Sequence, residues 1–111
     1  MSQLTLSWLA LLAAGACEIV WAVGLKLSDG FRNLTWTGIT LAAIFASMGL
    51  MAYAFRAIPI GTGYAVWTGI GAAGTAIVGI YLFDEPRDWL RVASIAMIVA
   101  GVIGLKIGML R

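Results

Sequence analysis

Long apolar stretches alternate with short polar segments along this chain of 111 residues. Four stretches, roughly residues 4–25, 34–55, 60–83 and 92–109, come close to the ~20 residues that a helix needs to cross a bilayer. Their apolar residues are continuous rather than alternating, and the stretches are about twice as long as the strands of a membrane β-barrel. The pattern therefore predicts an all-α integral membrane protein, with residues 1–111 forming a single domain of four transmembrane helices.

The composition agrees with a lipid environment and excludes several functions. Hydrophobic residues make up 62% of the chain and charged residues 11%, and the mean hydropathy is +1.00. With Cys17 as its one cysteine and no histidine, the chain offers no disulfide framework and no zinc-type ligand set, so we expect no metal and no cofactor. The net charge of +2 is too small to suggest nucleic acid as a partner.

Basic residues flank the two ends of the predicted helices almost equally. Lys26, Arg32, Arg87 and Arg91 lie at one end, and Arg56, Lys106 and Arg111 lie at the other. Since an excess of Lys and Arg normally marks the cytoplasmic side, this balance lets the chain insert in either orientation. It favours a dual-topology, antiparallel homodimer, although a short chain also simply has few charges to count.

The last stretch carries small residues at regular spacing. Ser94, Gly101 and Gly108 recur every seven residues, and Gly104 and Gly108 continue a ridge with a period of four. Such ridges let helix backbones approach closely in a membrane. We expect these residues to form the dimer contact, with packing inside one chain as the alternative.

Glu18 is the one charged residue inside an apolar stretch rather than at its edge. It precedes Lys26 by eight residues, which places it about 12 Å below that end of the helix. A charge at this depth costs on the order of 3 kcal/mol or more, so a proton or a cation should accompany it. Burial favours the protonated carboxyl and a bound cation favours the ionised one, so the two compete. Competition of this kind is the minimal chemistry of an antiporter, whereas the structural alternative is a protonated Glu18 hydrogen-bonded to another helix.

Polar and aromatic residues are placed to surround Glu18. Trp21 follows it by three residues on the same helix face, and Gly15 leaves space one turn earlier. Ser47 is the deepest hydroxyl of the second stretch, and Tyr64 and Trp67 are three residues apart on the third. These groups could donate hydrogen bonds to a carboxylate or stack on a flat cation. Trp8, Trp36 and Trp89 instead fit an aromatic belt at the membrane interface.

Residues 69–74 match the dinucleotide pattern G-x-G-x-x-G. That pattern requires a preceding strand and a soluble βαβ unit, and here it lies within a membrane helix. Glycine pairs within a helix are instead places where it bends. A bend at Gly69 and Gly71 could exchange access between the two sides of the membrane.

Several motifs together resemble the small multidrug resistance family over essentially the whole chain. They are Gly15-Ala16-Cys17-Glu18 with Trp21, the run from Leu25 to Phe31, the run from Pro59 to Gly71, and Glu85-Pro86. The resemblance implies an antiparallel homodimer that exchanges protons for cations through the Glu18 pair. It also implies that Tyr64 and Trp67 line the site and that residues 69–71 form the bend.

Within that family the motifs look closer to guanidinium exporters than to exporters of quaternary ammonium and other multidrug cations. Trp21 one turn after Glu18, Thr68 after Trp67, and Ser47 all fit the guanidinium type. Guanidinium is small, planar and rich in N–H donors, which suits a carboxylate with tight polar surroundings. Ala16 and Cys17 are smaller than the residues usual before the glutamate and could admit larger substituted guanidines.

The sequence thus predicts a transporter rather than an enzyme. We expect a multi-pass protein of the bacterial cytoplasmic membrane that exports guanidinium by alternating access, with protons, lipid and a second copy as its other partners. The main alternative is a quaternary ammonium or multidrug exporter. A non-transporting subunit with one membrane carboxylate would lack these aromatics, and a heterodimer subunit would show a stronger charge bias.

Overall fold

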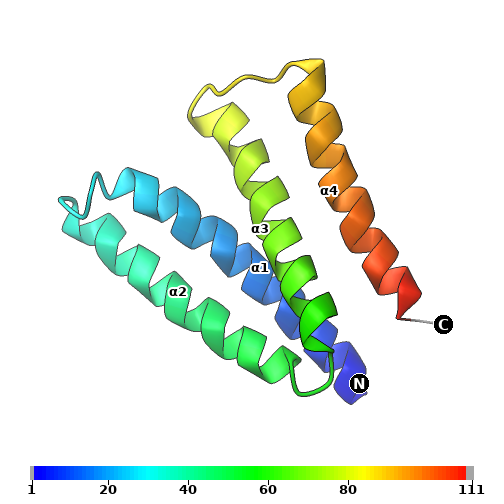
Figure 1. Cartoon of the computed structure of the whole chain (residues 1–111). Helices are drawn as coiled ribbons and strands as arrows, with labels where there is room; N and C mark the ends of the chain where they lie inside the picture. The colour runs from blue at the N-terminus through cyan, green and yellow to red at the C-terminus, as the bar shows by residue number, and fades with distance from the viewer. Residues whose placement is uncertain (1, 110–111) are drawn as a thin grey trace.

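The computed structural model describes residues 2–109, and within them the chain forms four α-helices (Figure 1). They are α1 (Gln3–Leu27), α2 (Leu34–Ala54), α3 (Ile60–Leu82) and α4 (Trp89–Gly108). Each is long and apolar enough to cross a membrane. The prediction of an all-α chain with four membrane-length helices is therefore confirmed.

The start of α4 differs most from the sequence prediction, since the helix begins at Trp89 rather than near residue 92. Asp88 is the cause. Its side chain accepts a hydrogen bond from the backbone N–H of Arg91 at 3.1 Å, which caps the first turn. The cap makes residues 89–91 helical, although hydropathy alone assigns these residues to the loop.

The connections are short, and the first of them is held by side chains. The Ser28 hydroxyl donates to the carbonyl of Leu25 at 2.6 Å, and the Asn33 side chain caps α2 by accepting from the N–H of Trp36 at 3.2 Å. Gly30, with φ of 67°, makes the reversal between them. Adjacent helices consequently run in opposite directions.

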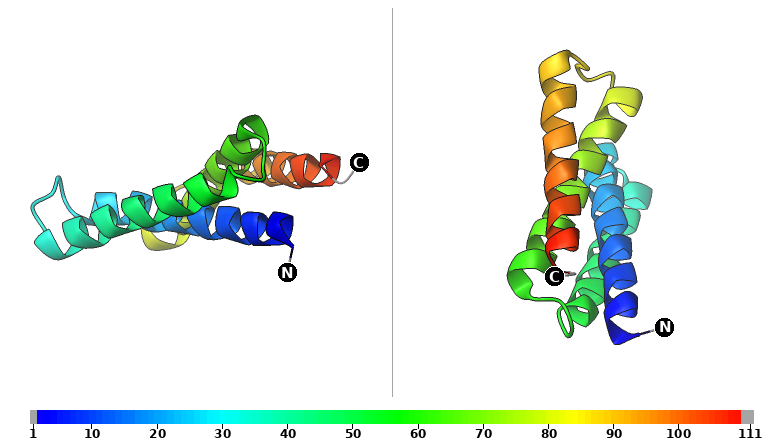
Figure 2. Two further views of the ribbon diagram at one scale, coloured as in Figure 1. Left: turned by 90° about the horizontal axis from the view of Figure 1, so that it is seen from below. Right: turned by 90° about the vertical axis from the view of Figure 1, so that its right-hand side faces the viewer.

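The helix α1 holds the molecule together, because it packs against both α2 and α3. The helix α4 packs against α3 and has no buried residue. In Figures 1 and 2, α4 stands at one side of the molecule, with α3 between it and the α1–α2 pair. The start of α1 and the end of α4 lie at the same end of the molecule (Figure 1).

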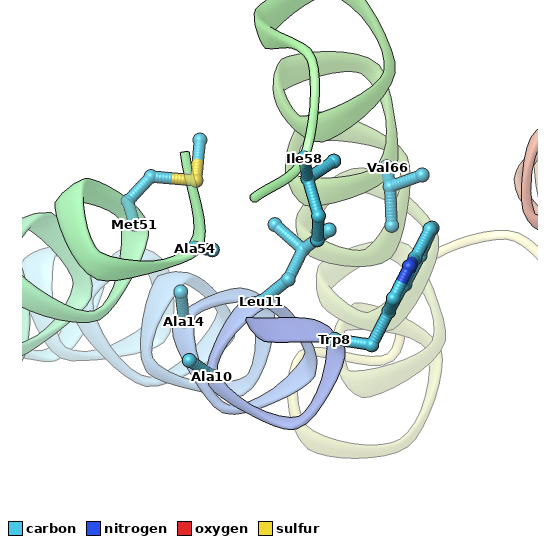
Figure 3. Packing of buried hydrophobic residues seen from close by; sticks show 8 residues of the cluster. All are labelled: Trp8, Ala10, Leu11, Ala14, Met51, Ala54, Ile58 and Val66. Carbon is cyan, nitrogen blue, oxygen red and sulfur yellow. The ribbon is translucent and has the colours of Figure 1, made fainter. Parts of the chain in front are cut away.

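The hydrophobic core lies at that end, where α1 meets the end of α2 and the start of α3 (Figure 3). It contains Trp8, Ala10, Leu11, Ala14, Met51, Ala54, Ile58 and Val66. Trp8 is only 6% exposed, so its ring packs against other helices of the chain. Its ring fills the space beside Val66 on α3 (Figure 3), because apolar packing between helices is available to it there.

Glycines bring the helices close together. A Cβ added at Gly24 would lie 2.6 Å from the Thr40 hydroxyl of α2, and one added at Gly15 would lie 2.7 Å from Ile70 of α3. Small residues of this kind allow close backbone approach in lipid, where no hydrophobic force drives helices together.

Candidate functional site

A cavity of about 450 Å³ lies between α1 and α3 and reaches the segment that follows α3. Its lining comprises Glu18, Trp21, Ala22, Val23, Lys26, Thr68, Gly71, Ala72, Thr75, Ala76, Gly79, Phe83, Glu85 and Arg91. The volume is within the range of about 300–1,000 Å³ that is usual for small-molecule sites.

Glu18 lies at the inner end of this cavity. Its carboxyl group sits directly over Gly71, and a Cβ added to that glycine would collide with it. The Oε2 atom is buried and has no hydrogen-bond partner within residues 2–109. The only ion pair among the described residues joins two other side chains, Arg91 and Glu85. A buried carboxylate oxygen without a partner is unfavourable, and it leaves Glu18 able to bind a proton or a cation.

Trp21 lines the same cavity one turn after Glu18, as the sequence predicted. Across from this pair, α3 presents the hydroxyl-bearing side chains of Thr68 and Thr75. Around Glu18 the cavity therefore combines one acidic group, one broad aromatic ring and two small polar groups. This combination suits a small organic cation better than a metal ion, and residues 2–109 contain no cluster of metal ligands.

Three other predicted site residues, Ser47, Tyr64 and Trp67, lie together outside the cavity lining. The Ser47 hydroxyl donates to the carbonyl of Ala14 and accepts from the indole N–H of Trp67, each at 2.9 Å. Tyr64 contacts Trp67 edge-on, with ring centroids 5.3 Å apart. Within one chain, Ser47, Tyr64 and Trp67 are therefore joined to one another and do not line the Glu18 cavity.

The predicted glycines have packing roles. Gly15 receives Ile70 of α3 and does not open onto the cavity. Gly69 receives Val102 of α4, since a Cβ there would lie 2.5 Å from the valine Cγ2. Gly71 receives Glu18, and α3 runs without interruption from Ile60 to Leu82.

The predicted dimer-contact residues on α4 are free of internal packing. Gly101, Gly104 and Gly108 are exposed, and a Cβ at each would meet nothing within 4 Å. The exposed Ser94 hydroxyl donates to the carbonyl of Leu90 in its own helix. Packing inside one chain therefore does not account for these small residues.

Sequence reasoning missed the charged outer end of the cavity. Arg91 donates to Glu85 at 2.6 Å and to the carbonyl of Ala76 at 3.3 Å, and Lys26 lies over the Phe83 ring at 5.5 Å. From the sequence, Lys26 and Arg91 are predicted only to be charges that set orientation. A signal was present in the stripe of small and hydroxyl residues at helical spacing on α3, which comprises Thr68, Gly71, Ala72, Thr75, Ala76 and Gly79.

A four-helix membrane protein whose membrane-depth carboxylate faces an open cavity has the architecture of a small transporter. A family model described as Small Multidrug Resistance protein matches residues 6–98. This chain belongs to that family, as its motifs had indicated, and it is not an enzyme.

Relatives within the family narrow the resemblance further. The chain is 55% identical to the guanidinium exporter of Proteus vulgaris over 102 residues, which cover 92% of this chain and 98% of that protein. The guanidinium exporter of Escherichia coli strain K12 is 54% identical, with 92% and 97% covered. That of Yersinia pseudotuberculosis is 53% identical, with 92% and 98% covered. The sequence thus groups with the guanidinium-exporter type, and this subtype prediction is confirmed.

Proposed function

We propose that this protein is a proton-coupled antiporter that exports guanidinium and small substituted guanidines across the bacterial cytoplasmic membrane. The names of relatives at 53–55% identity support the substrate. The position of Glu18 deep within α1 supports the coupling to protons, because a carboxylate at membrane depth needs a positive partner.

The observation that carries the proposal is the unpartnered Oε2 of Glu18 at the inner end of a cavity. A proton satisfies this oxygen when the cavity holds no cation, and a guanidinium ion satisfies it by a charge-assisted hydrogen bond. Because both use the same carboxylate, binding of one releases the other. This mutual exclusion couples the export of guanidinium to the import of protons.

The cavity walls favour guanidinium over a quaternary ammonium ion. Guanidinium is planar, so it can stack on Trp21 while its N–H groups reach Glu18 and the Thr68 and Thr75 hydroxyls. A quaternary ammonium ion has no N–H to donate and would leave these acceptors without partners. Export of quaternary ammonium ions is the alternative function that the experiment below must distinguish.

We further propose that two copies assemble as an antiparallel homodimer. Support comes from the unpacked small residues Ser94, Gly101, Gly104 and Gly108 on α4 and from the balanced basic residues at the two ends. The dimer contributes two Glu18 carboxylates, which together hold at most two protons. In this scheme, movement of α3 at Gly69 and Gly71 alternates the access of the shared site.

The proposal is tested by solid-supported membrane electrophysiology on protein reconstituted in liposomes. Guanidinium and methylguanidinium should give transport currents that fall as the pH is lowered, because protons compete for Glu18. The Glu18→Gln variant should give none, while the matched variant Asp84→Asn, outside the cavity, should transport like the parent. Currents with tetraethylammonium alone would replace the proposal with its alternative, and undiminished transport by Glu18→Gln would refute the coupling mechanism.

A further inference from the structure

The cavity has a carboxylate at each end. Glu18 lies over Gly71, and Glu85 lies over Gly79, two turns further along α3. Eight residues of helix separate the two glycines by about 12 Å. Both carboxylates line the same continuous cavity, so a cation that reaches Glu18 from the outer end passes Glu85.

The outer carboxylate already binds a guanidinium group, which belongs to Arg91. One terminal nitrogen of Arg91 donates to Glu85 at 2.6 Å and to the carbonyl of Ala76 at 3.3 Å. Thr75, beside Ala76, lines the same part of the cavity. The carboxylate, carbonyl and hydroxyl oxygens there are the acceptors that a free guanidinium ion would also need.

We propose that Glu85 is a second, outer binding site for guanidinium, and that the Arg91 side chain occupies it until an ion from solution takes its place. The inference rests on the proposed substrate of the Glu18 site, and it adds a binding step before the ion reaches Glu18.

The exchange of Arg91 for a free ion requires little energy. The Arg91 and Glu85 side chains are 29% and 40% exposed, and pairs this exposed contribute little to stability. One guanidinium group replaces another, so the kind of hydrogen bond is unchanged. Arg91 also leaves its own Nε buried without a partner among the described residues, so it fits the site incompletely.

Lys26 favours the exchange. Its ammonium group lies over the Phe83 ring at 5.5 Å, and among the residues that line this end of the cavity Lys26 and Arg91 place two positive charges against the carboxylate of Glu85. While Arg91 neutralises Glu85, an approaching cation meets Lys26 with no free carboxylate beside it. Release of Arg91 exposes a carboxylate that attracts the cation and raises its concentration near Glu18.

Binding measurements with ¹⁴C-guanidinium test the outer site directly. In a Glu18→Gln background, which lacks the inner carboxylate, the further substitution Arg91→Gln should open Glu85 and increase guanidinium binding at low salt several-fold. A third substitution, Glu85→Gln, should abolish that increase, whereas Asp84→Asn in its place should preserve it. Equal binding by the double variant and the triple variant that carries Glu85→Gln would overturn the proposal. Thermal melting of each variant in detergent confirms that only folded protein is compared.

Transport measurements test whether the outer site is used. Glu85→Gln should raise the KM for guanidinium several-fold at low ionic strength with a smaller change in maximal rate, and added salt should reduce the difference. An unchanged KM would overturn the proposal. If the parent protein transports no guanidinium but the binding series behaves as expected, the proposed function fails and the outer site stands. If the parent transports guanidinium and the binding series is flat, only the outer site fails.

Discussion

Glu18 and Gly71 act as one unit, because the carboxyl group occupies the space that any other residue at position 71 would fill. Glycine is required there for the close approach of α1 to α3 rather than for an unusual backbone angle. The position of the carboxyl group in the cavity therefore depends on a residue that carries no side chain of its own.

The variant Gly71→Ala should displace the Glu18 carboxyl group and weaken guanidinium binding at least ~10-fold, which corresponds to about 1.4 kcal/mol. Gly38→Ala is the matched control, since a Cβ at Gly38 meets nothing within 4 Å. Binding and transport of the two variants would be compared at equal protein content. Parent-like affinity in Gly71→Ala would show that the carboxyl group can be held elsewhere without loss.

At this scale the sequence identified Glu18 and Trp21, because a charge inside an apolar stretch is conspicuous and its helical neighbours follow from spacing. It did not identify Glu85 or Arg91. Their positions depend on the Asp88 cap and on a loop that folds back over Gly79. Hydropathy gives no information about such a fold, since charged residues between helices are expected in any case.

Among the helices, α3 connects the parts of the molecule. One of its faces holds Glu18 through Gly71, and another holds Val102 of α4 through Gly69. The helical extents could be predicted closely from the apolar runs. The residues that contact each face of α3 could not be predicted, because glycines are compatible with bending, cavity lining and close packing alike.

The variant Gly69→Ala should push α4 from α3, since the added methyl group meets Val102. Overpacking of this kind costs about 1–3 kcal/mol, which should lower the melting temperature of the protein in detergent. The double variant Gly69→Ala/Val102→Ala should recover most of the loss, because it removes the colliding methyl groups. A double variant no more stable than Gly69→Ala would instead indicate that α3 needs the glycine for backbone freedom.

For the whole molecule, the proposed antiparallel homodimer can be tested by cross-linking. In a background with Cys17→Ser, which removes the one cysteine of the chain, single cysteines can be placed at Ser94 and Gly108. These positions lie 14 residues apart, or about 21 Å along α4.

If the dimer is antiparallel, oxidation in membranes should cross-link Ser94→Cys of one copy to Gly108→Cys of the other when the two variants are co-expressed. Each variant expressed alone should cross-link poorly. Strong cross-linking of Ser94→Cys to itself would indicate parallel copies. A leucine at Gly101 should reduce cross-linking in the mixture, whereas a leucine at Gly38 should not.

The core is formed by α1, the end of α2 and the start of α3, yet α4 packs chiefly against α3, contacts α1 through Lys106 over the Trp8 ring, and carries an uncovered ridge. The number of spans and the balance of charges could be read from the sequence. The sequence could not show that α4 stays exposed while the other helices form the core, because all four helices are similarly apolar.

Gly69 and Gly71 lie two residues apart on α3, so the helix turn that contacts the Glu18 carboxyl group also contacts Val102 of α4. In the proposed homodimer, any cation whose affinity differs between single and paired subunits must, by thermodynamic reciprocity, change the strength of subunit association by the same factor. Occupancy and assembly are then a single linked equilibrium, and the affinity measured for a ligand will vary with the amount of protein per lipid.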